Sequence, residues 1–415
     1  MNVTILSIAT LLLPFALSLI FSTAHAQPTT IRIVSDEIAQ NFPYNIEFTL
    51  GAEDTYEITE ISIRFKSPAS DIWTYGYPNF VPGRQVKARY KLNTNGSMYV
   101  APGTDLKYFY VITNSNGQLF TTEPQIITYL DTRFTWNTTD KGSLRIMWHE
   151  TPANDLKQIS AELSISINRI RAILGTESTN LMKGIIYNTS SEGELAFPPQ
   201  SSTLTMERIF QGFAFPEWGI FLGIGLQTDL IVHEVSHLLM SQVVSSPGAT
   251  IPSWVNEGFA NYVASEGSSR YRISAIPGIR NHLYSMPLRN MNSIPGKAND
   301  IHAFYEKSES VVRFMINEFG EVKFREFLKQ LNHRTRPDDA LKSSYGFGIN
   351  ELEGRWFNEY PRVGMPDQAK FPYWSLSNML IGGMVILTAI MVFIRLVFTW
   401  MSKSAQFTKG HVSDE

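Results

Sequence analysis

His233-Glu234-Val235-Ser236-His237 is the stretch of sequence that says most about this chain. Residues four positions apart lie on one face of a helix, so the imidazoles of His233 and His237 can bind one metal ion together. Imidazole pairs at this spacing are typical ligands of Zn²⁺, and a Glu beside the first His reaches water at the metal. Apolar residues on both sides, 230–232 and 238–240, predict a buried helix. The pattern therefore predicts one Zn²⁺ per chain, with Glu234 as catalytic base.

Two imidazoles alone leave zinc short of ligands, because a catalytic site needs a third protein ligand and one open position. Glu257 follows His237 by twenty residues, within Trp254-Val255-Asn256-Glu257-Gly258-Phe259-Ala260. That interval allows the first helix to end, a loop to pass and a second helix to return. We therefore expect Glu257 to be the third metal ligand.

The pattern Trp-x-x-Glu-Gly-x-Ala at 254–260 resembles the third-ligand helix of the gluzincin metallopeptidases, the group that includes aminopeptidase N and thermolysin. Tyr305-Glu306-Lys307-Ser308 is similar to a Tyr-Glu-Lys-Gly segment of the aminopeptidase N family. There the Tyr hydroxyl stabilises the oxyanion of the tetrahedral intermediate, a role that suits a phenol donor. The resemblance implies a catalytic role for Tyr305, with His302 as the rival donor.

Gly212 to Ile220 resembles, less well, the Gly-x-Met-Glu-Asn motif of the same family and its following Trp-Gly. Pro216 stands where that family has the Glu that binds the substrate amine, and Glu217 comes one place later. The resemblance implies that Glu217 and Gly219 bind substrate, and this strand can pair with an extended peptide. Aminopeptidase and endopeptidase cleavage both remain open.

The composition excludes several other classes of protein. The chain has 415 residues, of which 43% are hydrophobic and 18% charged, as in folded proteins with two or three domains. A net charge of -3 without a basic block indicates no nucleic-acid partner. The chain contains no Cys, so a thiol nucleophile and a Cys-ligated metal are both excluded.

The domain pattern predicts an α+β protein. Short alternating strands separated by turns, among them 44–50, 60–65 and a hairpin of 107–111 with 119–121, predict an immunoglobulin-like β-sandwich over 27–131. After this region the apolar residues recur at the three- to four-residue spacing of helices. The resemblance implies a mostly helical, thermolysin-like catalytic domain over 132–365.

Both ends of the chain carry membrane signals. Residues 1–26 fit a secretory signal peptide, although an uncleaved anchor stays open because the first residues lack Lys and Arg. After a linker, 366–374, an uncharged run predicts a transmembrane helix over 375–401. Basic residues around it place the tail, 402–415, in the cytoplasm and the catalytic domain outside.

The sequence thus predicts a zinc metallopeptidase held at the cell membrane by one C-terminal span. Its catalytic domain would lie on the extracytoplasmic side, with a peptide or protein as substrate and the lipid bilayer as a partner of the C-terminal helix. The alternative is a zinc-containing module without catalytic activity that presents the β-sandwich to a partner protein.

Overall fold

The computed structural model describes residues 30–67, 72–150, 153–198, 211–265 and 286–363. The predicted signal peptide, linker, transmembrane helix and tail all lie outside these residues. Within the described ranges, no helix is both long and apolar enough to cross a membrane.

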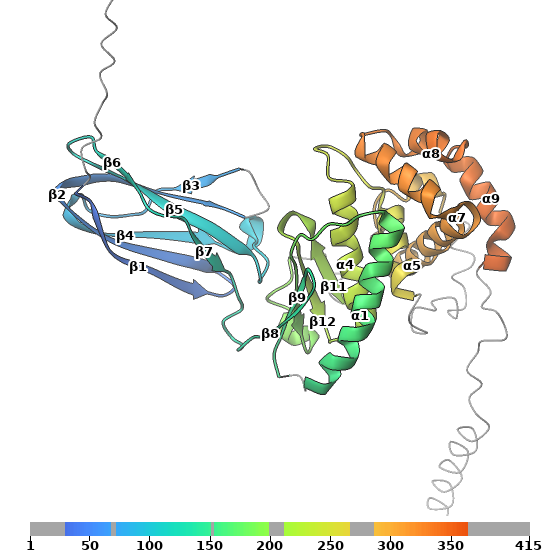
Figure 1. The fold of residues 1–415 in the computed structure, drawn as a ribbon, viewed down its shortest axis with the longest axis horizontal. Coiled ribbons are helices and arrows are strands. Elements are labelled where there is room, and N and C mark those ends of the chain that lie inside the picture. The colour runs from blue at the N-terminus through green and yellow to red at the C-terminus, as the bar shows by residue number, and fades with distance from the viewer. Residues whose placement is uncertain (1–29, 68–71, 151–152, 199–210, 266–285, 364–415) are drawn as a thin grey trace, which may run out of the picture. The chain divides into compact units, whose positions relative to one another are not determined.

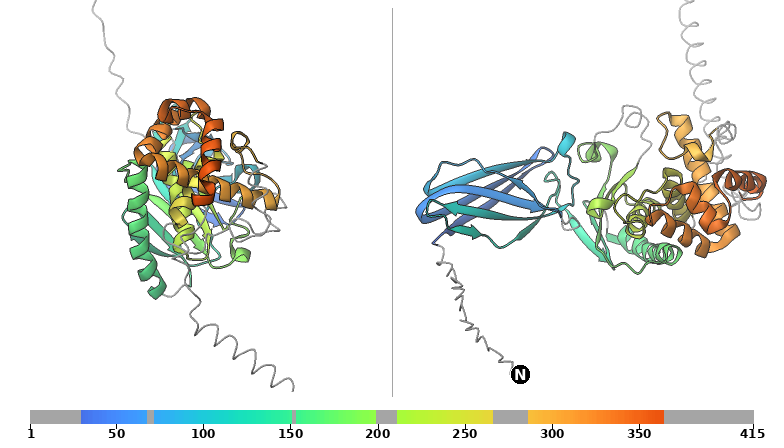
Figure 2. Two further views of the ribbon diagram at one scale, coloured as in Figure 1. Left: turned by 90° about the vertical axis from the view of Figure 1, so that its right-hand side faces the viewer. Right: turned by 90° about the horizontal axis from the view of Figure 1, so that it is seen from above.

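The chain divides into two compact units. The first takes in the chain up to Thr135 together with Leu195–Pro198, and the second takes in the remainder. Figures 1 and 2 show strands throughout the first unit and all the long helices in the second. A β-rich N-terminal part and a helical C-terminal part confirm the predicted α+β class, whereas the immunoglobulin-like topology stays a prediction.

The first unit is organised around one unusually long strand, β2. Its first half pairs with β1 and β4, and its second half pairs with β3 and β5. Side chains that point inward from both halves, such as Phe48 and Ile63, share a single hydrophobic core. The seven strands are β1 (Arg32–Asn41), β2 (Asn45–Lys66), β3 (Thr74–Gly76), β4 (Gly83–Asn93), β5 (Asp105–Asn114), β6 (Leu119–Thr121) and β7 (Gln125–Thr128).

The second unit contains a mixed five-stranded sheet in the order β11-β12-β10-β9-β8. The pairs β9–β10 and β10–β12 are parallel, whereas the outer strands β8 and β11 run antiparallel to their neighbours. Among the described strands, β11 pairs with β12 alone and is the outermost strand on its side of the sheet. The strands are β8 (Asn137–Lys141), β9 (Leu144–Trp148), β10 (Met182–Tyr187), β11 (Gly212–Phe215) and β12 (Ile220–Ile224).

Helices pack against one another and against one face of this sheet. Helix α4 lies centrally, against α1, α5 and the strands β11 and β12, and α5 packs extensively on α7. The helices are α1 (Ala153–Leu174), α2 (Ser190–Gly193), α4 (Thr228–Val243), α5 (Ser253–Ser265), α7 (Ala298–Asn332), α8 (Pro337–Tyr345) and α9 (Ile349–Val363), with single 3₁₀ turns at η1 (Gly96–Met98), η2 (Pro216–Trp218) and η4 (Leu288–Asn290).

One feature of the strand pattern differs from the sequence prediction. The strands expected at 44–50 and 60–65 are one continuous strand, because residues 51–59 stay extended and continue the ladder. The helix α7 is interrupted at Gly320, whose backbone is non-helical with φ 82°. The predicted hairpin of β5 and β6 is confirmed.

Candidate metal centre

Helix α4 presents both imidazoles of the predicted metal motif. The helix is apolar on most of its surface, so burial holds it in place: Ile231, Val235 and Leu239 all lie in the core of the second unit. His233 and His237 project from the same side, one turn apart, as the four-residue spacing predicts.

Helix α5 brings the third ligand to the same place. Glu257 lies in the second turn of α5, and Trp254 and Phe259 on either side of it are fully buried. Gly258 allows α5 to approach α7 closely, because a β-carbon at this position would lie 2.3 Å from the backbone oxygen of Ser308. The position of Glu257 therefore depends on a glycine contact with a third helix.

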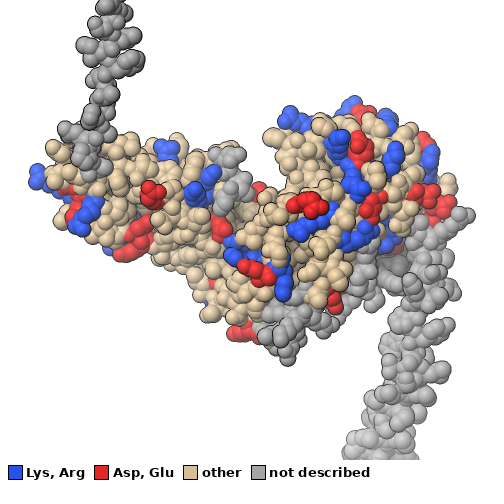
Figure 3. Space-filling model, viewed as in Figure 1, with Lys and Arg blue, Asp and Glu red and all other residues tan. Residues whose placement is uncertain are grey.

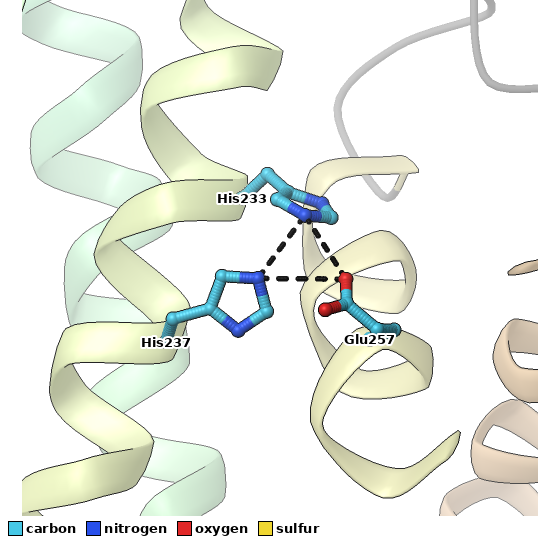
Figure 4. A group of neighbouring side chains, drawn as sticks. All are labelled: His233, His237 and Glu257. Carbon is cyan, nitrogen blue, oxygen red and sulfur yellow. Dashed lines mark hydrogen bonds and ion pairs between the residues drawn. The ribbon is translucent and has the colours of Figure 1, made fainter. Parts of the chain in front are cut away.

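His233, His237 and Glu257 form the one group of metal-ligating side chains found within the described part of the chain. Their potential ligand atoms lie within 4.8 Å of one another, as Figure 4 shows. The two Nε2 atoms are 3.2 Å apart, and a Glu257 oxygen lies 3.5 Å from Nε2 of His233 and 3.6 Å from Nε2 of His237. Zinc bonds of about 2.0–2.1 Å at tetrahedral angles separate neighbouring ligand atoms by about 3.3 Å. The three side chains therefore fit one zinc ion without rearrangement.

Burial and mutual attraction oppose each other in setting the charges of these ligands. Burial favours neutral forms, but at His233 it is outweighed by the hydrogen bond that the imidazole donates to Glu257 together with the negative charges of Glu234 and Glu257, and the pKa of that imidazole is raised. At His237 burial prevails and the pKa is lowered. The two imidazoles overcome the burial of Glu257 and lower the pKa of its carboxyl group. An anionic carboxylate and neutral imidazoles form the donor set that zinc prefers.

Glu234 lies next to the ligands in a pocket almost closed to solvent, with only 4% of its surface exposed. Burial raises the pKa of its carboxyl group to about 7. Strand β11 runs directly beside it: a β-carbon on Gly212 would be 2.4 Å from Oε1 of Glu234. Only a glycine allows strand β11 to approach this carboxylate so closely.

Tyr305 lies near the start of α7 and is partly buried against the core of the second unit. His302, the rival donor, is partly exposed one turn earlier on the same helix. The following turn of α7 is tied down by Lys307, a cation that is 1% exposed. Its Nζ donates to the backbone oxygen of Met286 at 2.7 Å and to Glu353 of α9 at 2.5 Å. The helix that carries both candidate donors is thus fixed by a buried ion pair.

The two residues that the resemblance implied for substrate binding lie beyond the other end of β11 from Gly212. Glu217 is exposed on the 3₁₀ turn η2, and Gly219 ends that turn in a left-handed conformation with φ 65°. Neither belongs to the metal-ligating group.

Sequence reasoning missed two side chains that act on the ligands. A hydrogen bond with Asn261 contributes to the raised pKa of His233, and a hydrogen bond with Asn256 acts against the lowering of the pKa of His237. Both lie on α5, so the helix that supplies Glu257 also orients the imidazoles of α4. Asn261 lies four residues after Glu257, on the same side of α5, and that spacing is the signal that could have identified it, whereas the position of Asn256 gives no such signal.

The family comparison gives a direct match. Residues 164–360 match the family model of the Peptidase MA superfamily, a range that includes every ligand described above. No curated protein matches the sequence of this chain.

Solved structures with some similarity are distant. An M1 zinc metallopeptidase from Deinococcus radiodurans is 12% identical, over 84% of this chain and 97% of that chain, with a TM-score of 0.37. OgpA from Akkermansia muciniphila is 7% identical over 24% of this chain, with a TM-score of 0.20, and this chain spans only 28% of that protein. A carbohydrate-binding module of family 56, a β-1,3-glucan binding domain, is 13% identical over 23% of this chain and 96% of that domain, with a TM-score of 0.16. All three TM-scores lie below 0.5, so these structures support no conclusion about the chain, and only the match to the family model does.

Proposed function

Because residues 164–360 belong to the Peptidase MA superfamily of gluzincin-type zinc metallopeptidases, we propose that this chain binds one Zn²⁺ and hydrolyses peptide bonds. His233, His237 and Glu257 would hold the ion. The observation that carries the proposal is the convergence of these three side chains beside the buried carboxyl group of Glu234.

A bound zinc ion supplies a Lewis acid for the scissile carbonyl and lowers the pKa of water toward neutrality. Glu234 takes the proton from the attacking water and delivers it to the leaving amine. Its closed surroundings suit this work, because burial keeps bulk water from competing for the proton. Tyr305 donates a hydrogen bond to the oxyanion that develops on the substrate.

The outer side of β11 is where an extended peptide would bind. An added strand would pair its backbone with β11, as peptides do at the exposed edges of other sheets. Gly212 places the first residue of this strand against Glu234, so a peptide on the edge passes the catalytic base. Glu217 and Gly219, beyond the other end of the strand, would contact a more distant residue of the same peptide.

We further propose that the enzyme acts outside the cytoplasm, anchored by the predicted helix at 375–401. The support is the uncharged run between Lys370 and Arg395, together with the basic residues that follow it. On the face of the second unit drawn in Figure 3, basic and acidic side chains lie interspersed, as on an ordinary solvated surface. Alkaline carbonate extraction tests the anchor: the full chain should stay with the membranes and a chain ended at residue 365 should not. Release of both would refute the anchor.

Glu234→Gln in the full-length protein tests the catalytic proposal. The substitution keeps the shape of the side chain but removes the base, so peptide hydrolysis should fall at least 100-fold while zinc stays near one ion per chain. Glu318→Gln is the matched control, since Glu318 is exposed on α7 and should leave activity and zinc content unchanged. Hydrolysis at the wild-type rate by Glu234→Gln would overturn the mechanism.

A further inference from the structure

A buried cation joins three segments of the second unit beside the part of α7 that carries Tyr305. Lys307 of α7 donates from its Nζ to Oε1 of Glu353 on α9 at 2.5 Å and to the backbone oxygen of Met286 at 2.7 Å. The same Oε1 accepts a hydrogen bond from the backbone N–H of Leu288 at 3.0 Å. One ion pair therefore holds α7, α9 and the segment that runs into η4 at a single point.

A second set of contacts holds the same part of α7 against α9. The indole Nε1 of Trp356 donates to Oγ of Ser310 at 3.1 Å, and that hydroxyl donates to the backbone oxygen of Lys307 at 2.9 Å. Nζ of Lys307 also lies over the ring of Trp356, 5.0 Å from its centroid. We call these four side chains the α9 clasp: Lys307, Ser310, Glu353 and Trp356.

The α9 clasp holds α7 from the side opposite to Tyr305. Successive residues of an α-helix are about 100° apart around its axis, so positions two apart are separated by about 200°. Lys307 therefore leaves α7 on the side away from Tyr305. The backbone of α7 is non-helical at Gly320, so the first half of the helix does not take its position from the second half alone. Contacts such as the α9 clasp must position it.

The ion pair in the α9 clasp determines geometry more than it adds stability. Burial lowers the pKa of the Lys307 ammonium group although Glu353 opposes the change, so desolvation of the cation exceeds its gain from the carboxylate. Apolar side chains of similar volume often stabilise a core as well as a buried ion pair does. Charged hydrogen bonds differ from apolar contacts in that they are directional, so they favour one arrangement of the three segments.

We infer that Glu353 is a positioning residue for Tyr305: through Lys307, the α9 clasp fixes the place of the phenol that donates to the oxyanion, an inference that rests on the proposed peptidase function. An oxyanion donor is effective only within hydrogen-bond distance of the developing charge, and a displacement of about 1 Å loses most of its effect. Glu353 and Lys307 act through the turn of α7 that carries Tyr305. Helix α9 thus takes part in catalysis although it carries no metal ligand.

Steady-state kinetics of the full-length, zinc-loaded protein test the inference, with a peptide that the wild type cleaves in a mixed library. Glu353→Gln can still accept from Leu288 but loses its charge, so kcat should fall about 10- to 100-fold. KM should stay unchanged, because the oxyanion forms only in the transition state, and zinc should stay near one ion per chain. Glu351→Gln is the matched control: Glu351 lies on α9 in an exposed ion pair with Arg355, and its loss should change neither kcat nor KM.

A double-mutant cycle shows whether Glu353 acts through Tyr305. Tyr305→Phe should lower kcat about 100- to 1000-fold, as removal of an oxyanion donor does. Addition of Glu353→Gln to Tyr305→Phe should change kcat by less than about 2-fold, because no donor is left to position. Losses that multiply would overturn the inference. A wild-type kcat in either single variant would also overturn it, while leaving peptide hydrolysis intact.

A variant without charge separates positioning from stability. Lys307→Met/Glu353→Gln has no unpaired buried charge, so its melting temperature should return close to the wild-type value. Its kcat should nevertheless stay as low as that of Glu353→Gln. Recovery of the wild-type kcat together with stability would show that the pair is only structural, and would overturn the inference. Absence of cleavage of any peptide by the zinc-loaded wild type would instead refute the peptidase function itself.

Discussion

Gly258→Ala is the substitution that most directly probes how the metal site is built. Gly258 follows the ligand Glu257 on α5, and an alanine β-carbon there would lie 2.3 Å from the backbone oxygen and 2.6 Å from the backbone carbon of Ser308 on α7. It would also lie 2.8 Å from a methyl group of Val312. Two of these three atoms belong to the backbone of a helix, so no side-chain rotation can relieve the clash.

The size of the effect follows from these distances. The closest separation must rise from 2.3 Å to the 3.4 Å at which ordinary contact begins, so α5 and α7 must move apart by about 1 Å. Such overpacking costs about 3 kcal/mol, and the better helix propensity of alanine recovers about 1 kcal/mol. A net loss of about 2 kcal/mol should lower the melting temperature of the second unit by about 4–8 °C. Because metal ligands tolerate errors of about 0.2 Å, zinc affinity should fall about 10- to 100-fold.

Competition with a chromophoric chelator measures the zinc affinity, and calorimetry measures the melting temperature. Gly354→Ala is the matched control, because nothing lies within 4 Å of its added β-carbon on the exposed side of α9. That control should bind zinc like the wild type and be more stable by about 1 kcal/mol. If Gly258→Ala retained wild-type affinity and melting temperature, the close approach of α5 to α7 would not determine the position of Glu257.

Three other outcomes are expected. Lys307→Met leaves Glu353 without its buried partner and should destabilise the second unit by about 2–4 kcal/mol in thermal unfolding. An unchanged melting temperature would show that the ion pair contributes nothing to stability. Removal of metal with a chelator should lower the melting temperature of the wild type, because zinc at 100 times its Kd stabilises the folded state by about 2.7 kcal/mol. The same treatment should leave the melting temperature of His237→Ala unchanged, because this variant lacks a metal ligand. Asp54 has a lowered pKa because hydrogen bonds from Asn114 and others outweigh its desolvation. This carboxylate should therefore stabilise the first unit above about pH 4, and that stability should be lost as the pH falls through the lowered pKa. Melting curves of Asp54→Asn at pH 3–7 should lack this part of the pH dependence.

The metal ligands could be predicted from sequence because their geometry is local. His233 and His237 lie on one helix, where spacing alone determines their relative position, and Glu257 lies on the next helix of the chain. The parts that could not be predicted depend on contacts between distant segments. The approach of Gly212 to Glu234 and of Gly258 to Ser308 joins elements with unrelated sequence patterns. The ion pair of Lys307 with Glu353 links residues 46 positions apart, and nothing in either local pattern indicates the partner.

The fold shows the same division between local and distant information. The apolar residues at 230–232 and 238–240 predict a buried helix, and α4 spans both of these stretches. Apolar and polar residues alternate at 44–50 and 60–65, and this pattern predicts two strands. In the structure they form the single strand β2, because β1 and β4 pair with residues 51–53 and β4 and β5 pair with Ile58, so tertiary pairing extends the strand beyond the local pattern.

The shortness of β11 has a consequence for the behaviour of the protein in solution. The outermost strand of a sheet becomes a template on which other chains can aggregate when nothing covers it. Here that strand is only four residues long, and Pro216 follows it directly, a residue that has no backbone N–H to extend the ladder. The edge can therefore hold a short extended peptide but cannot propagate a continuous sheet. The same four residues that would admit a substrate protect the protein from edge-to-edge association with its own copies.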